Sequence, residues 1–227
     1  DYWVGSDEYV PVSRAQDAIA GMERWFGSSR LVRVEAYGKR YRDLADASGT
    51  DDPSVRGDEF AAVSGRTYGV DLLVRQLETR RLSGWLAYGY AVSTRERDGS
   101  RYWPAQDRRH TLNAVASLRT DRGWILGSRL GVASGVPYTP VVGQQYRRIY
   151  DGSRNEWITT GELQPVLGDR NSERYPAFHR LDLSVSRRFA RGRATGAPWL
   201  SVVNAYDQGN VFLYTYDYTA NPPRRGT

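Results

Sequence analysis

The chain has 227 residues, 40% of them hydrophobic, and no run approaches the ~18 consecutive apolar residues of a membrane-spanning helix. It has no cysteine and only two histidines, which excludes a disulfide framework and disfavours metal sites built from thiolates or imidazoles. The net charge is +6, but the arginines are scattered along the chain, so we expect no nucleic-acid partner.

The chain begins with DYWVGSDEYV, which lacks the basic start and apolar core of a signal peptide. We therefore expect a mature chain or a piece of a longer protein. From there the sequence alternates apolar and polar residues in about eight segments, and this period of two predicts β-strands with one apolar and one polar face. In chain order, strands are expected at 15–26, 31–41, 65–77, 84–94, 110–119, 123–134, 178–189 and 198–206.

The connections between these segments alternate in length. Short turns join the two strands of each pair, whereas long polar loops at about 42–58, 95–107 and 136–177 separate the pairs. A meander with short turns at one end and long loops at the other is typical of outer-membrane barrels. Soluble sandwiches mix connection lengths at both ends and use crossovers.

The composition of the two faces favours a membrane barrel over a soluble β-domain. The apolar faces carry mainly Val, Leu and Ala, as in Leu181, Leu183 and Val185. A soluble barrel fills its small interior with bulky apolar side chains, and five Phe and one Met would make a thin core. We expect the apolar faces to contact lipid and the charged faces to line a lumen, although the period alone leaves a soluble protein open. The expected lumen-lining residues are Asp71, Arg75, Arg129, Arg180 and Asp182.

Aromatic residues occupy two levels of the expected strands. Tryptophans near the short turns are Trp25, Trp85, Trp124 and Trp199, and tyrosines toward the long loops are Tyr37, Tyr41, Tyr90 and Tyr138. Two such levels are typical of strands that cross two membrane interfaces. Trp25 and Trp85 nevertheless fall on the parity of the polar face, and packing in a soluble core is the alternative.

No motif indicates catalysis or a metal site. His110 follows Asp107 by three residues and His179 precedes Asp182, but a single histidine with a nearby carboxylate is a weak signal for a hydrolase. The acidic stretch at 50–59 lacks the spacing of a calcium loop, and no helix follows the glycines to form a phosphate cradle. We expect no catalytic residue, no metal ligand and no cofactor.

Several sequence segments resemble the C-terminal part of the barrel of TonB-dependent outer-membrane receptors. They are GWILGSRLGVASGVPYTPVVG, YPAFHRLDLSVSRRF and LSVVNAYDQGNVFLYTYD, preceded by GRTYGVDLLVRQ and GWLAYGYAVST, which are similar to the previous hairpin of that family. The resemblance implies an all-β antiparallel meander of about eight transmembrane strands, part of a larger outer-membrane β-barrel. Because the family has about 22 strands around a plug domain, residues 1–227 are expected to be the C-terminal portion of such a barrel. We expect the family's plug domain, its TonB box and its aromatic-ended last strand to lie outside residues 1–227; the sequence given ends NPPRRGT.

The resemblance also implies a function, namely TonB-energised import of a scarce nutrient such as a ferric siderophore, a glycan or a peptide. The implied location is the outer membrane of a Gram-negative-type bacterium. The implied partners are the lipid bilayer and lipopolysaccharide, the plug and remaining strands of the same receptor, TonB and the nutrient. We expect ligand contacts in the longest loop at Tyr138, Tyr146, Arg147 and Arg148. The alternative is a small self-standing outer-membrane barrel with a structural or hydrolytic role.

Overall fold

A computed structural model describes residues 11–47, 60–77, 81–217, 220 and 223–226, and these contain strands but no helix that could cross a membrane. The longer strands are β1 (Arg14–Phe26), β2 (Arg30–Ala47), β3 (Phe60–Gln76), β4 (Leu82–Arg97), β6 (His110–Arg119), β7 (Trp124–Ala133), β9 (Val141–Asp151), β10 (Glu156–Leu167), β12 (Phe178–Arg187) and β15 (Trp199–Val202). The short strands are β5 (Ser100–Tyr102), β8 (Pro137–Tyr138), β11 (Glu173–Arg174), β13 (Phe189–Arg191), β14 (Ala194–Gly196), β16 (Thr215–Asp217) and β17 (Arg224–Gly226).

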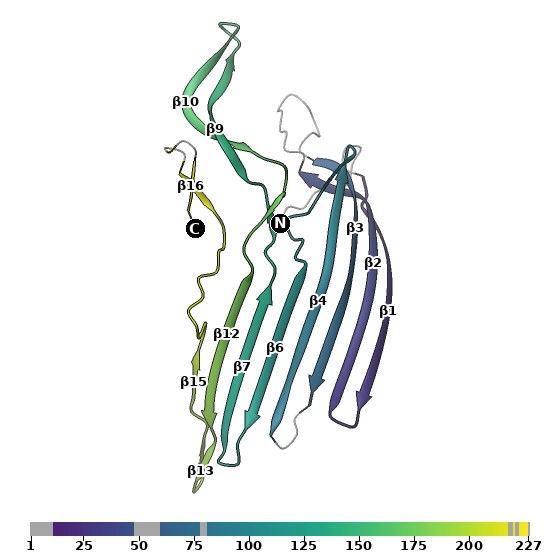
Figure 1. Cartoon of the computed structure of the whole chain (residues 1–227), viewed down its shortest axis with the longest axis vertical. Helices are drawn as coiled ribbons and strands as arrows, with labels where there is room; N and C mark the ends of the chain where they lie inside the picture. The colour runs from purple at the N-terminus through teal and green to yellow at the C-terminus, as the bar shows by residue number, and fades with distance from the viewer. Residues whose placement is uncertain (1–10, 48–59, 78–80, 218–219, 221–222, 227) are drawn as a thin grey trace.

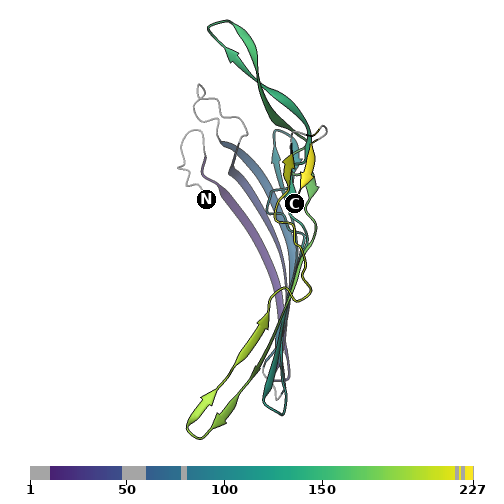
Figure 2. The same cartoon turned by 90° about the vertical axis from the view of Figure 1, so that its left-hand side faces the viewer.

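One antiparallel sheet forms the body of the molecule. Its strand order is β1-β2-β3-β4-β6-β7-β12-β15, with the short β5 paired to the end of β4 (Figure 1). The sheet is curved when seen from the side (Figure 2) and remains open, with β1 and β15 at its edges. The expected antiparallel meander of about eight strands is confirmed.

The register joins the apolar faces of the separate strands into one surface. Val34 lies opposite Leu72, which lies opposite Tyr88, and the row continues through Leu112 to Val132. Residues directly opposite each other on paired strands point to the same side of the sheet. Neighbouring rows repeat this arrangement, so we call this side the apolar face and the other side the polar face.

The apolar face is open to its surroundings. Tyr68 is 55% exposed, and Leu126 and Leu183 are each 44% exposed. The buried apolar residues of the described chain are few: Leu31, Val63, Val92, Ala133 and Tyr138. Soluble monomers rarely expose a contiguous apolar surface of more than a few hundred Å². The face therefore has the character of a surface that contacts lipid or another apolar partner.

All three long connections contain more strand than the sequence predicts, and the one expected at 95–107 contains the end of β4 and the whole of β5. Residues 136–177 join β7 to β12 as expected, but β9 and β10 form a hairpin that projects beyond the sheet (Figure 1), and β8 pairs with β11 at its base. Val, Ile, Tyr, Thr and Trp are frequent in β9 and β10 and favour strands. The connection from β2 to β3 begins later than residue 42, because β2 continues to Ala47, and residues 48–59 lie outside the described chain.

The last strand of the sheet is shorter than predicted. β15 ends at Val202 because the chain turns at Asn204 and Asp207, which adopt positive φ angles of 57° and 53°. The Asn204 side-chain oxygen accepts a hydrogen bond from the Gln208 amide at 3.0 Å and closes this turn. Asparagine and aspartate tolerate this backbone conformation better than other non-glycine residues.

The tryptophans near the short turns are divided between the faces, as the parity of Trp25 and Trp85 in the sequence indicates. Trp124 lies on the apolar face, whereas Trp25 and Trp85 lie on the polar face in one row with Arg75. Trp199 is opposite Ser186 and also lies on the polar face. Tryptophan next to a turn therefore does not by itself identify the lipid side, because the neighbouring polar face also offers apolar contacts.

Candidate functional site

The polar face carries all five residues that the sequence marks as lumen-lining. Arg129 lies opposite Asp182, and Arg180 donates to the Asp182 carboxylate over 3.0 Å. The other Asp182 oxygen accepts a hydrogen bond from the Asn204 amide at 3.0 Å. The structure therefore brings three of the five residues together in one charged cluster on β7 and β12.

The remaining two residues, Asp71 and Arg75, are not brought together. They lie four residues apart on β3, which separates their Cα atoms by about 13 Å. Asp71 lies opposite Glu35, so two carboxylates face each other across β2 and β3. Arg75 instead lies between Leu31 and Trp85.

A groove of about 420 Å³ surrounds Asp71 on the polar face. Its lining includes Arg33, Glu35, Tyr37, Asp71, Leu73, Arg108, Thr111 and Asn113. The Tyr37 ring lies over Gly69, where an added Cβ would come within 2.6 Å of the Tyr37 hydroxyl. Charges of both signs in this groove suit a polar partner that fills the space beside the sheet.

Asp107 is the one charged residue counted as buried in the described chain, with 2% exposure. It accepts a hydrogen bond from the Ser93 amide at 2.7 Å and forms ion pairs with Arg174 and with Arg109. Arg174 also donates to the backbone oxygens of Asp107 at 2.8 Å and of Gly135 at 3.1 Å. The contacts of Asp107 therefore hold residues 134–177 against the long-loop end of β4.

A second contact of this kind lies nearby, at the end of β2. Arg170 pairs with Asp46 at 3.0 Å, and its guanidinium lies 4.3 Å from the centre of the Tyr102 ring. The Tyr102 hydroxyl donates a hydrogen bond to the Asp46 carboxylate. Burial and this hydrogen bond raise the pKa of Tyr102 to about 12.

An aromatic cluster forms at the base of the β9–β10 hairpin. Tyr138 is 8% exposed and its ring centre lies 4.5 Å from that of Tyr175 and 5.3 Å from that of Tyr214. Its hydroxyl donates to Glu173 and accepts from Arg225 at 3.1 Å. Burial, with the Glu173 hydrogen bond, raises the pKa of Tyr138 to about 12.

The four expected ligand contacts are divided between two places. Tyr138 lies in the aromatic cluster just described, whereas Tyr146, Arg147 and Arg148 lie on β9 in the projecting hairpin. Tyr146 is 57% exposed, Arg147 pairs with Glu162 at 3.3 Å, and Arg148 lies 5.8 Å from the Trp157 ring centre.

Sequence reasoning missed most of the side chains that build this end of the molecule. These are Trp103, Arg109, Arg170, Arg174, Tyr175 and Tyr214. The available signal was the density of Arg, Tyr and Trp at 101–109 and 170–175. Because these side chains contact residues far away in the sequence, composition alone could not predict which of them pair.

Both histidines pair with tyrosines rather than with carboxylates. The Nδ1 atom of His110 shares a hydrogen bond of 2.8 Å with Tyr88, and that of His179 shares one of 2.9 Å with Tyr206. Where the chain is described, no group of three or more His, Asp or Glu side chains could hold a metal ion. The side chains that contact one another at this end are mainly arginines, tyrosines and the carboxylates that pair with them.

No protein-family model and no curated protein match the chain in sequence. Among solved structures, it is similar to the ferripyoverdine receptor of the outer membrane of Pseudomonas aeruginosa, which was solved bound to ferripyoverdine. The likeness has a TM-score of 0.55 and 11% identity, and covers 90% of this chain but 24% of that chain. The fold is therefore similar to that of part of this receptor's β-barrel. The all-β antiparallel architecture inferred from the sequence is thereby confirmed, and the sheet of this chain is open.

Proposed function

We propose that the chain is the C-terminal portion of an outer-membrane receptor that imports a scarce nutrient with energy from the TonB system. The observation that carries this proposal is the two-faced sheet: one continuous apolar face and one charged face on a curved antiparallel meander. The membrane is the outer membrane of a Gram-negative-type bacterium, and lipid covers the apolar face.

The dimensions of the sheet support this placement. β2, β3 and β4 have 18, 17 and 16 residues, and β6 and β7 have 10 each. A tilted strand needs ~9–11 residues to span a bilayer. Because unpaired strand edges are not tolerated in lipid, β1 and β15 pair with further strands in the complete receptor, and a plug domain contacts the polar face.

Among the nutrients considered, a ferric siderophore fits the long-loop end best. The similar receptor was solved bound to ferripyoverdine. In this chain, the hairpin presents Arg147, Arg148 and Tyr146, and cationic and aromatic side chains suit an anionic chelate with aromatic groups. Asp107 and Asp46 hold the segment that carries the hairpin in place.

The test replaces residues 145–164 by Gly-Gly in the complete receptor and measures uptake of a panel of siderophores loaded with radioactive iron. We expect uptake of at least one siderophore by the unaltered receptor, none in a strain without TonB, and a loss of tenfold or more in the variant. The variant retains assembly, because β9 pairs with β10 rather than with the main sheet. The matched control is Arg154→Ala in the tip of the hairpin, an exposed residue that pairs with Asp151. Uptake that is independent of TonB, or absent for every siderophore in the panel, contradicts the proposal.

A further inference from the structure

A small hairpin of β13 and β14 extends the sheet at its short-turn end. Pro198 precedes β15 and has no N–H to donate to β12, so the ladder between β12 and β15 ends beside it. Within the described chain, β13 and β14 then pair only with each other, from Phe189 opposite Gly196 to Arg191 opposite Ala194. The hairpin reaches beyond the turn between β6 and β7 in both views of the molecule (Figure 1 and Figure 2). We call it the basic hairpin, for the reason that follows.

The sequence around the basic hairpin carries positive charge alone. Residues 183–206 contain four arginines and no carboxylate, and the structure describes all of them. The four exposed arginines are Arg187, Arg188, Arg191 and Arg193. The Arg187 guanidinium lies 5.2 Å from the centre of the Trp124 ring, which offers no negative charge.

Carboxylates from other segments do not cancel this charge. In the turn between β6 and β7, Asp121 pairs with Arg81 at 2.6 Å and is followed by Arg122. Residues 78–80, outside the described chain, add one glutamate and one arginine. Residues 1–10 join β1 at the long-loop end, and ten residues reach at most about 36 Å, whereas β1 alone is about 40 Å long. Residues 48–59 are tied to that end at both sides, by β2 and β3.

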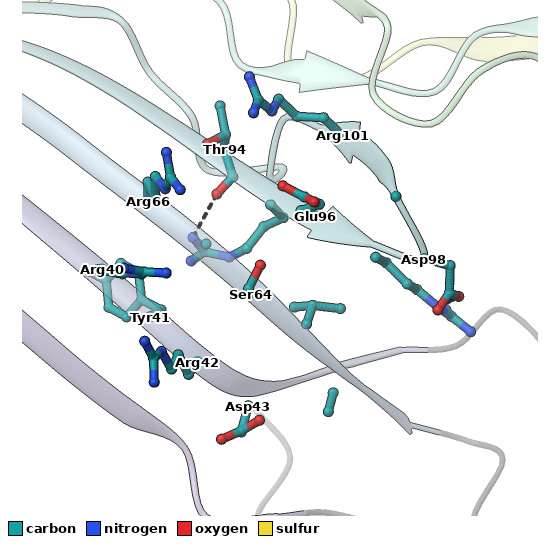
Figure 3. Close-up of a pocket in the computed structure, with 16 residues that line it drawn as sticks. Arg40, Tyr41, Arg42, Asp43, Ser64, Arg66, Thr94, Glu96, Asp98 and Arg101 are labelled. Atoms are coloured by element: carbon teal, nitrogen blue, oxygen red, sulfur yellow. Dashed lines mark hydrogen bonds and ion pairs between the residues drawn. The ribbon is translucent and has the colours of Figure 1, made fainter.

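The pocket at the opposite end of the sheet is different. It lies between the long-loop ends of β2, β3 and β4, and arginines and carboxylates line it together (Figure 3). Arg40 and Arg66 are among its arginines, and Glu96 and Asp98 among its carboxylates. Two arginines of this pocket therefore provide a matched control for the basic hairpin.

A groove of about 500 Å³ lies at the basic hairpin. It is lined by Arg188, Phe189, Ala190, Thr195, Gly196 and Ala197. The Phe189 ring lies against Gly196, where an added Cβ would come within 2.5 Å of the ring, so glycine makes room for it. Phe189 is nevertheless 52% exposed. The groove thus combines an exposed apolar floor with arginines around it.

The tip of the basic hairpin lies beyond the lipid layer in the membrane placement proposed above. Trp124 lies on the apolar face opposite Arg187, and tryptophan marks the interface of a bilayer. Arg191 is four residues farther along the chain, up to about 13 Å in an extended strand. The headgroup layer on each side is only about 5–8 Å deep. The short turns of outer-membrane barrels face the periplasm, so the tip stands in periplasmic water.

We propose that the basic hairpin binds an acidic peptide segment of a periplasmic protein, with an apolar side chain of that peptide in the groove over Phe189. The proposal rests on the proposed function, which sets the membrane placement. Arginine clusters recognise acidic segments through charge-assisted hydrogen bonds. The outer edges of β13 and β14 offer backbone groups to an extended chain. The apolar floor favours a peptide over a bare anion, which leaves that floor uncovered.

The test measures the binding of fluorescent octapeptides to the detergent-purified complete receptor by fluorescence anisotropy. The first probe has a central leucine among aspartates and glutamates. The second has glycine in place of the leucine, and the third has lysine in place of every acidic residue. We expect the first probe to bind, the second to bind about tenfold more weakly because it leaves the groove empty, and the third not to bind.

The variant Arg191→Gln/Arg193→Gln tests the charged part of the site. We expect it to lose about fivefold in affinity for the first probe, since exposed charge pairs each contribute modestly. High salt weakens the binding to the unaltered receptor, because it screens exposed charges. The matched control, Arg40→Gln/Arg66→Gln, removes two arginines at the opposite end of the sheet and leaves the affinity within twofold. Heat-modifiable gel mobility verifies that each variant is folded.

Several results would overturn the assignment. They are equal loss in the control pair, no loss in Arg191→Gln/Arg193→Gln, or equal binding of the acidic and the lysine probes. Displacement of the first probe by phosphatidylglycerol at the same concentration assigns the basic hairpin to lipid and overturns the peptide site. A receptor that assembles and imports its nutrient but does not bind the first probe contradicts this site alone. A receptor that never enters the outer membrane contradicts the proposed function.

Discussion

At the scale of single residues, the long-loop end depends on a few charged side chains that join segments distant in sequence. Asp107 is the clearest case, because its carboxylate contacts β4 through Ser93 and the segment after β7 through Arg174. Removing either partner of a buried ion pair destabilises the folded protein, because the remaining charge is left without its counter-charge.

The substitution Asp107→Asn tests this role. It keeps the shape of the side chain but leaves Arg174 and Arg109, which are 29% and 30% exposed, without their counter-charge. We expect a loss of about 2 kcal/mol, below the usual value for a fully buried pair because the arginines retain some water. Urea unfolding in detergent and proteolysis of residues 134–177 measure it. Asp121→Asn, which breaks the exposed pair with Arg81, is the control and leaves both readouts unchanged.

Tyr138 predicts a pH dependence of the aromatic cluster. Its pKa of about 12 lies above the ordinary value of 10.0, so the unfolded chain loses this proton at lower pH than the folded chain. The unfolded state then binds fewer protons between these two values, and the stability that Tyr138 contributes falls as the pH rises from about 10 to about 12.

Tyrosinate absorbance checks this prediction. Tyr138→Phe removes part of the component that titrates near pH 12, and Tyr102→Phe removes another part, because the pKa of Tyr102 is also raised to about 12. An unchanged titration curve in Tyr138→Phe contradicts the buried, hydrogen-bonded environment of this hydroxyl.

At the scale of the element, the middle of β12 shows the two faces clearly. Leu183 lies opposite Ser128 and Val202 on the apolar face, whereas Ser184 lies opposite Gly127 and Ser201 on the polar face. Adjacent positions of one strand therefore provide a matched pair of substitutions.

We expect Leu183→Arg to block membrane assembly and Ser184→Arg to be tolerated. Arginine on the lipid side of a barrel costs about 2–4 kcal/mol near the midplane, whereas lumen positions accept charge. Gly127 opposite Ser184 leaves room for the longer side chain. Heat-modifiable mobility and the yield in the outer-membrane fraction are the readouts. If both variants behave alike, the assignment of the faces is wrong.

At the scale of the whole molecule, the exposed apolar face predicts how the protein partitions. We expect it to stay in the membrane pellet after washing with high salt and with urea, and to need detergent for extraction. High salt releases proteins that are bound to a membrane by surface charge, because salt screens exposed ion pairs. The apolar face, where Val70 is 43% exposed and Val74 is 39% exposed, does not depend on charge and is expected to stay in lipid. Recovery of folded protein in the soluble fraction without detergent contradicts the membrane placement.

The strands could be predicted well where alternation is local and continuous. β6 begins and ends at the predicted residues, His110 and Arg119, because a period of two needs no information from the rest of the chain. The hairpin of β9 and β10 was missed because proline, glycine and polar residues interrupt its alternation, and its strands gain stability from each other. The ligand contacts were predicted from the length of the loop alone. The structure therefore separates them: Tyr138 is buried, whereas Arg147 and Arg148 lie on the hairpin.

The sequence by itself determined that the chain forms alternating strands, that each strand has an apolar and a polar side, and which end carries the long connections. Only the tertiary structure decided which residues meet. Asp46 and Arg170 are 124 residues apart in the chain, and Asp107 and Arg174 are 67 apart. The period of a strand is set by its own backbone, whereas register and ion pairs depend on partners that are brought close by the sheet as a whole.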